Sequence, residues 1–360
     1  MNIKTNKMEI KNIKRTFPLY KNDGISLVNL TKDQKKYKKI LLEKINSKEL
    51  RLVKKTCICG NTNKNLDVVI TEKDRYGIPV KMICCSRCGL IRSDEVFDEK
   101  SNELFYTYYY RPLYSSLNPD DNFFQEQYNK GEYFIELIRD HLSLSEIENI
   151  AEIGCGAGGI LLPFKEAGKN IQGVDFGEDY IKFGQEKGLN LQRGGDDLIE
   201  DESIDLLILS HVMEHYLSPL SELQKNIQKV KKGKYLLIEV PGIFCIAEHY
   251  YNPLLYFQNA HVYNYYGDYL VNMFEQLGLE TLYMNERCTF ICRKKENKKN
   301  DFLHTIDIPE NISNKYPVLI LSYLYNQKKT YEYRFFNINV WKRKAIMLAK
   351  KMGYKKQDHE

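Results

Sequence analysis

Short apolar runs alternate with helical patterns through the second half of the chain. Runs at 149–153, 171–175, 204–210 and 234–241 contain few polar positions, which is typical of parallel strands buried on both faces of a sheet. Another short strand ends at 194–198. Together these runs predict a sheet with several parallel strands.

Helical patterns at 160–164 and 218–230 separate some of these strands, and a third at 269–277 precedes two further strands at 280–284 and 289–293. The last two strands are too close in sequence for a crossover helix, so they predict an antiparallel hairpin. The expected fold class is therefore α/β, with a mostly parallel sheet that ends in an antiparallel hairpin.

The turn after the first strand is rich in glycine, with Gly154, Gly156, Gly158 and Gly159 following Glu152. Glycines allow a tight turn whose backbone lies directly against a ligand. The spacing of Gly154, Gly156 and Gly159 also fits a dinucleotide-binding fold. The turn alone therefore leaves both kinds of site open.

Carboxylates follow the next two strands. Asp175, before Phe176, is placed to accept hydrogen bonds from both ribose hydroxyls of a nucleoside. Asp196 and Asp197 end the third strand, where an adenine edge would lie.

This order of features resembles the class I S-adenosylmethionine-dependent methyltransferases, whose Rossmann-like sheet ends in the same hairpin. The resemblance covers about residues 149–293, and Glu152–Gly158 is similar to the first motif of the family. Nicotinamide dehydrogenases rarely place an acidic residue two positions before the first glycine. The resemblance implies a cofactor site made by Glu152, Gly154, Cys155, Gly156, Gly158, Asp175, Phe176, Asp196, Asp197 and Ser210.

Five of the nine cysteines lie within residues 57–88. In a cytosolic chain such a cluster favours a metal over disulfides. The predicted ligands of a structural zinc ion are Cys57, Cys59, Cys85 and Cys88, although the first pair is spaced C-x-C and Cys84 is a further candidate. A degenerate ribbon without metal is the alternative.

A zinc ribbon followed by a methyltransferase core resembles methyltransferases with an N-terminal zinc-binding domain. The resemblance implies an enzyme that methylates a nucleotide-linked sugar or glycan precursor in polysaccharide biosynthesis. Two alternatives are an RNA methyltransferase and a non-enzymatic zinc-ribbon adaptor whose core is a cofactor-binding relic. The ribosomal RNA methyltransferases with an N-terminal zinc site have a histidine ligand that this chain lacks.

Charge is unevenly distributed along the chain. Residues 1–55 hold 16 Lys and Arg against 5 Asp and Glu, and residues 293–360 hold 16 against 7. Since the whole chain carries +5, residues 56–292 carry −15. An acidic core suits a sulfonium cofactor and argues against a long nucleic-acid track, whereas the basic ends suit weak contact with an anionic membrane surface or simple solvation.

No apolar run approaches the ~18–20 residues of a membrane span, and the Lys-rich start lacks the apolar centre of a signal peptide. We therefore expect a cytoplasmic protein. The predicted segments are a basic N-terminal arm (1–55), a zinc-ribbon-like module (56–95), a Tyr-rich helical connector (96–148), the core (149–293) and a basic helical C-terminal extension (294–360).

Within the outer segments, helices are predicted at 31–46, 316–325 and 340–352. The connector contains a tyrosine cluster at 106–114, whose rings suit either a nucleobase or sugar, or packing between domains.

Three histidines are candidates for the general base that a sugar hydroxyl or an activated carbon needs. His211 and His215 follow the fourth strand, and His261 lies where the resemblance places the acceptor site. Related sugar C-methyltransferases have a Glu-His pair there, but Ala260 precedes His261, so a carboxylate partner is not expected and C-methylation is in doubt.

Overall fold

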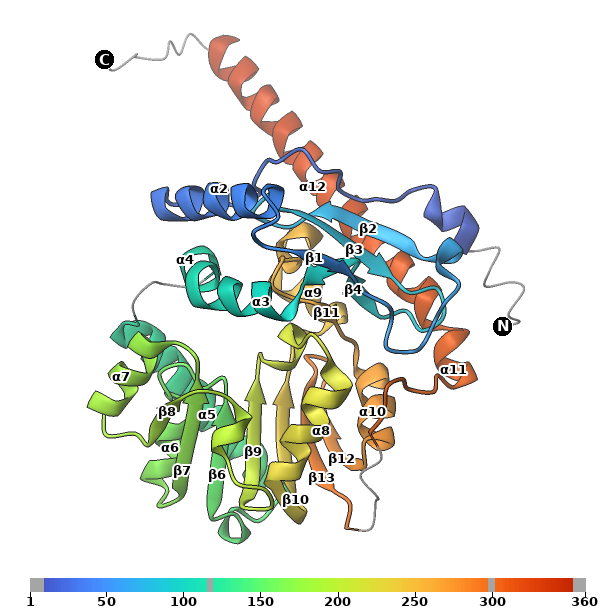
Figure 1. Cartoon of the computed structure of the whole chain (residues 1–360). Helices are drawn as coiled ribbons and strands as arrows, with labels where there is room; N and C mark the ends of the chain where they lie inside the picture. The colour runs from blue at the N-terminus through green and yellow to red at the C-terminus, as the bar shows by residue number, and fades with distance from the viewer. Residues whose placement is uncertain (1–9, 115–118, 297–301, 352–360) are drawn as a thin grey trace.

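The computed structural model describes residues 10–114, 119–296 and 302–351, with side chains described up to residue 335. A seven-stranded sheet forms the lower half of the molecule in Figure 1, and a smaller four-stranded sheet lies above it. The two larger sheets of the described residues correspond to the core and the ribbon that the sequence predicts as separate units.

The large sheet has the strand order β12-β13-β10-β9-β6-β7-β8. Strands β10, β9, β6, β7 and β8 run parallel, and β6 and β9 bury apolar side chains on both faces. Strand β13 runs antiparallel to both of its neighbours. This confirms the predicted parallel sheet with a terminal hairpin. The strands are β6 (Asn149–Ile153), β7 (Asn170–Asp175), β8 (Leu191–Arg193), β9 (Ile204–Ser210), β10 (Val230–Glu239), β12 (Leu279–Met284) and β13 (Thr289–Lys294).

Helices flank this sheet, namely α5 (Asp121–His141), α6 (Leu161–Glu166), α7 (Glu178–Glu186), α8 (Pro219–Lys229) and α10 (Gly267–Gln276). Helix α5 comes from the predicted connector, yet it packs tightly against the start of α6. A Cβ at Gly131 of α5 would lie only 2.4 Å from the carbonyl oxygen of Ile160. Glycine is needed where α5 crosses the start of α6. Helix α5 therefore belongs to the large domain.

The small sheet combines the N-terminal module with a strand from the core. Its order is β11-β4-β3-β2, and the strands are β2 (Val68–Lys73), β3 (Pro79–Cys84), β4 (Ile91–Ser93) and β11 (Tyr263–Asn264). Tyr263 of β11 pairs with Arg92 of β4. A separate two-stranded sheet joins β1 (Leu52–Lys54) to β5 (Glu95–Phe97). The N-terminal module and the core thus share backbone hydrogen bonds.

The described part of the N-terminal arm also packs on this module. The helix expected at 31–46 is α2 (Lys32–Asn46), which begins with a capping box between Thr31 and Gln34 and buries Leu41. Upstream of it, the backbone N–H of Leu19 donates to Ile70 of β2. The arm therefore lies along the edge of the small sheet.

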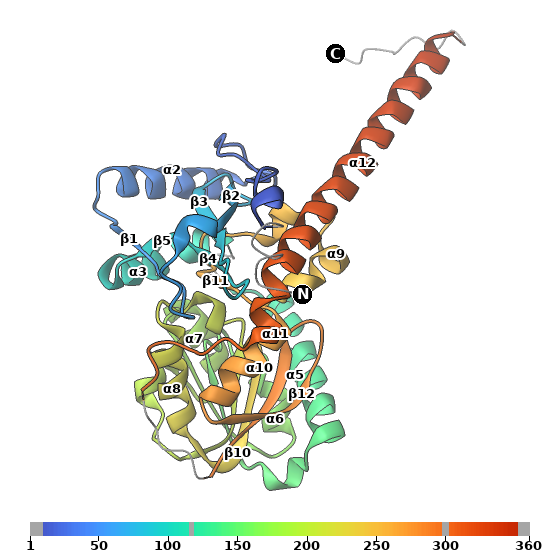
Figure 2. The same cartoon turned by 90° about the vertical axis from the view of Figure 1, so that its right-hand side faces the viewer.

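The tyrosine cluster forms a π-helical turn (Tyr106–Tyr110) and α4 (Arg111–Tyr114), and α3 (Glu99–Phe105) directly precedes it. Both views place this stretch between the two sheets, above the carboxyl ends of the parallel strands (Figures 1 and 2). Ligands bind at this end in open α/β sheets. The N-terminal half therefore covers the end of the sheet where a site is expected.

The C-terminal extension contains α11 (Glu310–Ser313) and the long α12 (Tyr316–Lys351), which projects away from the body in Figure 2. We predicted two helices at 316–325 and 340–352, and this was wrong, because they are parts of one helix. Residues 326–339 contain neither Gly nor Pro, so nothing ends the helix between them. Among the described residues, no helix is both long and apolar enough to cross a membrane.

Candidate active site

The glycine turn follows β6 and is held against β7. The backbone N–H groups of Gly154 and Cys155 both donate to the carbonyl oxygen of Val174. Gly154 has a φ of 71°, and a Cβ there would lie 2.6 Å from Cγ2 of Val212. Only glycine combines this backbone conformation with so close a neighbour. The thiol of Cys155 is buried, so its side chain belongs to the core.

Glu152 is a buried carboxylate directly before this turn. Its side chain is 1% exposed, and Oε2 has no hydrogen-bond partner among the described residues. Burial raises the pKa of Glu152 to about 8, against the opposing effect of Lys130. An unpaired buried acceptor suits a cationic ligand group, such as the ammonium of a methionine moiety. This environment is compatible with the place of Glu152 in the predicted cofactor site.

Asp175 ends β7 and has three hydrogen-bond donors around its carboxylate. Gly156 N donates to Oδ2 at 3.0 Å, and Gly177 N donates to Oδ1 at 2.6 Å. Nη2 of Arg111 also donates to Oδ1, at 3.0 Å, while the Arg111 guanidinium lies 3.7 Å from the centre of the Tyr180 ring. The predicted ribose-binding carboxylate is therefore linked to the tyrosine cluster through Arg111.

The residues predicted to bind adenine lie around the end of β8. Phe176 is 70% exposed and lies close to Gly195. Asp196 accepts a hydrogen bond from Asn226 Nδ2 at 3.3 Å, and Asp197 is exposed. The structure thus brings Phe176 and the two aspartates to one edge of the site, with the flat Phe176 ring available for stacking.

The second group of polar residues lies at the carboxyl ends of β9 and β10. Ser210 ends β9, His211 follows with a φ of 56°, and Glu214 and His215 lie in a 3₁₀ turn (Met213–His215). A non-glycine residue with positive φ is uncommon and often marks a functional site. We call the five residues His211, Glu214, His215, Glu239 and His261 the acceptor cluster.

Glu214 is at the centre of the acceptor cluster. Its Oε1 lies 3.4 Å from His211 Nδ1, 3.9 Å from His215 Nε2 and 4.0 Å from His261 Nε2. We expected no carboxylate partner for His261, and this was wrong, because tertiary folding brings Glu214 to it from a different loop. All three candidate histidines therefore share one carboxylate.

A second carboxylate, Glu239, lies on the outer side of the cluster. Its Oε1 is 2.9 Å from His211 Nε2 and 2.7 Å from Lys130 Nζ of α5. His211 is the exposed member of the three histidines, with 45% of its side chain accessible. A series of ion pairs thus connects Lys130 to Glu239, Glu239 to His211, and His211 to the buried Glu214.

The environment moves the pKa values of these histidines in opposite directions. For His211, burial acts to lower the pKa, but Glu214 and Glu239 outweigh it and raise the pKa to about 9. Burial lowers the pKa of His215, and it lowers that of His261 well below the usual range. Burial acts to raise the pKa of Glu214, yet the surrounding histidines lower it to about 2. The cluster therefore contains a charged histidine on the outside and two neutral ones inside.

The N-terminal half holds His215 and His261 in place. The Tyr106 hydroxyl lies 2.9 Å from His215 Nδ1. The loop that carries His261 is bonded to the small sheet, because Arg75 N donates to Phe257 O at 3.0 Å and Asp74 Oδ2 accepts from Asn259 N at 3.2 Å. The position of His261 thus depends on the zinc-ribbon-like module.

Residues 124–283 match the family model described as "Methyltransferase domain". The chain contains a class I S-adenosylmethionine-dependent methyltransferase domain. The match begins inside α5, which agrees with the packing of that helix on α6. We call the part of the domain that contains Glu152, the glycine turn and Asp175 the cofactor end, because the cofactor is predicted to bind there, and the part that contains the acceptor cluster the acceptor end.

The methyltransferase domain is similar to a sterol 4-C-methyltransferase of Caenorhabditis elegans, strm-1, with 28% identity over 115 residues. The matched part is 29% of this chain and about a third (34%) of that protein. Among solved structures, an S-adenosylmethionine-dependent methyltransferase of Archaeoglobus fulgidus shares 22% identity, with coverage of 49% of this chain and 75% of the other and a TM-score of 0.37. One from Mesorhizobium loti shares 12% identity, with coverage of 44% and 94% and a TM-score of 0.36.

Four cysteines of the N-terminal module converge as predicted. Their sulfur atoms all lie within 4.8 Å of one another, with 3.5 Å between Cys57 and Cys88 and 3.6 Å between Cys59 and Cys85. Ligands about 2.3 Å from a tetrahedral zinc ion have this spacing. Cys84 is not in the set, since its thiol faces the carbonyl oxygen of Gly89 at 3.4 Å. The C-x-C spacing is therefore compatible with a four-cysteine site.

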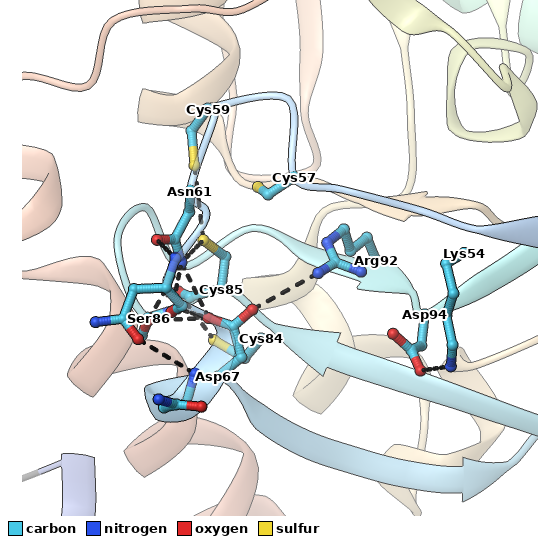
Figure 3. A network of polar contacts seen from close by, with 12 residues as sticks. Lys54, Cys57, Cys59, Asn61, Asp67, Cys84, Cys85, Ser86, Arg92 and Asp94 are labelled. Atoms are coloured by element: carbon cyan, nitrogen blue, oxygen red, sulfur yellow. Dashed lines mark hydrogen bonds and ion pairs between the residues drawn. The ribbon is translucent and has the colours of Figure 1, made fainter.

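Polar groups surround this four-cysteine site. Asn61 Nδ2 lies 3.5 Å from Cys85 Sγ and 3.2 Å from Asp67 Oδ1 (Figure 3). Asp67 also accepts from Ser86 N at 2.9 Å and faces Arg92, which the small sheet buries completely. Such outer hydrogen bonds orient metal ligands. The donor set and its surroundings fit a structural zinc ion.

Several residues near the site had not been predicted to take part in it. Glu239 ends an apolar strand, so the rule that selected Asp175 also applies to it. Tyr106 and Arg111 lie in the tyrosine cluster, for which ligand binding and packing were left open. Lys130 gives no local signal in the sequence. The roles assigned to the predicted site residues stay predictions.

Proposed function

We propose that this protein transfers a methyl group from S-adenosylmethionine to a small acceptor, namely a nucleotide-linked sugar or glycan precursor of a surface polysaccharide. The observation that carries the proposal is the covering of the acceptor cluster by the N-terminal half. Tyr106 bonds to His215, the Tyr110 ring lies 5.6 Å from it, and the loop before β11 is tied to the small sheet. An enclosed polar cluster next to tyrosine rings suits a compact acceptor with hydroxyl groups.

The cofactor end orients the methyl donor. S-adenosylmethionine supplies an electrophilic methyl group, and the protein must align the acceptor, the methyl and the leaving sulfur. Glu152 would pair with the ammonium, the glycine turn would lie against the methionine portion, and Asp175 would bind the ribose. Ser210 and the backbone of His211 lie where the cofactor end meets the acceptor cluster.

The acceptor cluster would orient the acceptor and handle its proton. His215 and His261 lie on the inner side of Glu214, and the half-exposed His211 lies on its outer side. A hydroxyl or activated carbon entering here would meet imidazole groups already held by a carboxylate, an arrangement typical of general acid–base sites. Where no ion takes part, one of the three predicted histidines would take the proton.

The four-cysteine site would have a structural role. Four thiolates leave no coordination position for a substrate. Zinc there would stabilise the module, and the module holds the loop that carries His261. Loss of the metal would therefore affect the acceptor end more than the cofactor end.

Charge supports a small acceptor over RNA. Residues 56–292 carry −15, and an RNA track would need a continuous basic surface over the active face. A cytoplasmic location and weak contact of the basic ends with anionic membranes stay predictions. The sterol named for the nematode relative represents another class of small acceptor.

The test is a methyl-transfer assay with release of S-adenosylhomocysteine as the readout. The panel holds nucleotide-linked sugars, sterols and structured RNA, and Asp175→Ala protein is the negative control. We expect turnover with at least one nucleotide-linked sugar. RNA methylation with steep salt dependence, and no reaction on any sugar, would overturn the proposal. Cofactor binding without turnover on any acceptor class would favour the adaptor.

A further inference from the structure

The acceptor cluster contains a second set of residues with metal-ligand chemistry. Glu214, His215 and His261 each offer one ligand atom, and these three atoms lie within 4.8 Å of one another. Two imidazoles and one carboxylate are a common donor set for divalent transition metals. The set is independent of the four cysteines, which lie in loops next to the small sheet.

Glu214 is the first reason to expect a cation here. Its side chain is 2% exposed, and neither carboxylate oxygen has a hydrogen-bond partner among the described residues. The nearest imidazole nitrogens lie at 3.4, 3.9 and 4.0 Å, so they surround the carboxylate without bonding to it. The charge of Glu214 is opposed only by the ion pair with His211, and a buried carboxylate whose oxygens have no hydrogen bonds is costly. An ion between Glu214 and the imidazoles would satisfy it.

The tautomer of His215 leaves Nε2, the ring nitrogen that faces Glu214, free to bind an ion. Its Nδ1 lies 3.0 Å from the carbonyl oxygen of Ala260, which can only accept a hydrogen bond. Nδ1 therefore carries the hydrogen, and Nε2, which faces Glu214, has the free lone pair. Metal-binding histidines almost always donate their second N–H to such a group. His215 is thus oriented as a metal ligand.

The same reasoning applies to His261. The Oε1 atom of Gln258 accepts from Arg75 Nη2 at 3.3 Å, which turns the amide nitrogen of Gln258 towards His261 Nε2. Nε2 of His261 is therefore the unprotonated ring nitrogen, and its single lone pair accepts from the Gln258 amide. An ion bound beside Glu214, whose Oε1 lies 4.0 Å from this nitrogen, would replace the Gln258 amide as its partner.

We propose that Glu214, His215 and His261 bind one divalent transition-metal ion of the zinc, iron(II) or manganese(II) class. Three protein ligands leave coordination positions open, as in catalytic metal sites. The two histidines come from loops that Tyr106 and the small sheet hold in place, so the site forms only when both halves of the protein are folded.

The role of this ion rests on the proposed function. An open position would hold a hydroxyl of the acceptor and lower its pKa. That hydroxyl would lose its proton to solvent, the carbon–sulfur bond of the cofactor would break with its electron pair on sulfur, and the methyl carbon would bond to the acceptor oxygen. The ion would then activate the acceptor hydroxyl, a role that a histidine base would otherwise have.

Metal binding is tested directly with Mn²⁺ and electron paramagnetic resonance, on full-length protein that retains zinc in its cysteine site. We expect about one Mn²⁺ per chain. Glu214→Gln and His261→Gln should each weaken Mn²⁺ binding by about tenfold or more, since even outer-shell changes cost ~10–100-fold. Glu248→Gln is the control, because Glu248 is an exposed carboxylate outside the acceptor cluster, and this variant should bind Mn²⁺ like the wild type.

Two further measurements keep the test decisive. Each variant should retain its zinc and its affinity for S-adenosylhomocysteine, which shows that the fold is intact. If a variant fails this check, His215→Asn is tested in its place. No Mn²⁺, Co²⁺ or Zn²⁺ uptake beyond the cysteine site would overturn the proposal, as would uptake that Glu214→Gln leaves unchanged. Because neither cofactor turnover nor an acceptor enters this assay, a protein that binds Mn²⁺ but methylates nothing would refute the proposed function alone.

Discussion

The cofactor end and the acceptor end of the methyltransferase domain are built in different ways. Glu152, the glycine turn and Asp175 lie within one β-α-β stretch, and backbone hydrogen bonds between neighbouring segments set their geometry. The acceptor cluster combines two strand ends and a loop that the small sheet holds, with Tyr106 against it. The first arrangement depends on local folding, and the second depends on the whole chain.

The strongest test of this difference is removal of the cysteine site. Cys85→Ser and Cys88→Ser should lose zinc and the folded module together, because a structural ion supplies folding free energy. Methyl transfer should fall below detection, while calorimetry still shows S-adenosylhomocysteine binding. Cys84→Ser is the matched control and should retain zinc, since Cys84 lies outside the set. A zinc-free variant with full activity would contradict the dependence of the acceptor end on the module.

A smaller change at the acceptor end should separate turnover from cofactor binding. His261→Gln should lower the turnover number by ~10²–10⁴, either as loss of a base or as loss of a metal ligand. The affinity for S-adenosylhomocysteine should be nearly unchanged, because the His261 side chain lies against Glu214, His215 and Gln258, which are not among the predicted cofactor residues. The exposed His249 provides the control, and His249→Gln should leave turnover unaltered. An unchanged rate in His261→Gln would direct attention to His211 and His215.

The converse change removes Asp175, the carboxylate that is predicted to bind the ribose. Asp175→Ala should weaken S-adenosylhomocysteine binding by several-fold to about a hundredfold, since a hydrogen bond to a charged group contributes ~1.5–3 kcal/mol. Mn²⁺ binding at the acceptor cluster should not change. Calorimetry and paramagnetic resonance on the same sample measure both, and Asp179→Ala, at an exposed position on α7, is the control. If Asp175→Ala weakened S-adenosylhomocysteine binding and Mn²⁺ binding equally, the two ends would not be independent of each other.

Glu152 predicts a pH dependence that belongs to the cofactor end. Its pKa is about 8 in the folded protein against 4.5 as the ordinary value, so the folded state holds the proton more tightly than the unfolded state. The free energy of unfolding should therefore fall as pH rises between these values. Binding of S-adenosylhomocysteine should strengthen from about pH 6 to about pH 8, by up to about tenfold per unit, because the ammonium pairs with the carboxylate.

Glu152→Gln should abolish both pH effects, which thermal unfolding and calorimetry at several pH values would show. The exposed Glu148, which immediately precedes β6, is the matched control, and Glu148→Gln should leave both in place. If the Glu152→Gln protein retains the wild-type pH profile of cofactor binding, a group other than Glu152 receives the ammonium.

The smallest expected effect concerns Arg111, the contact between the tyrosine cluster and the cofactor end. Its ion pair with Asp175 is only partly exposed, with 21% and 12% of the two side chains accessible. Such pairs contribute about 0–1 kcal/mol. Because Arg111 occupies the carboxylate that the ribose needs, Arg111→Met should strengthen S-adenosylhomocysteine binding by a factor of up to about 5. Weaker binding in calorimetry would show that Arg111 assists the cofactor instead.

The cofactor end was predictable because its chemistry is encoded within one short stretch. Apolar runs gave β6, β7, β9 and the hairpin nearly to the residue, and the glycines and Asp175 occupy fixed offsets from those strands. A tight turn needs glycine at particular positions, so the sequence pattern itself carries the geometry. The cysteine spacing likewise predicted the four converging sulfurs.

The acceptor end was decided only by the tertiary structure. No local pattern joins Glu214 to His261, and Lys130 and Tyr106 reach the acceptor cluster from helices that the sequence assigned to a connector. The pairing of β11 with β4 is a long-range contact between the core and the N-terminal module. Side-chain proximity of this kind depends on how whole elements pack, and packing depends on many residues at once, whereas strand and turn propensities depend on a few neighbours.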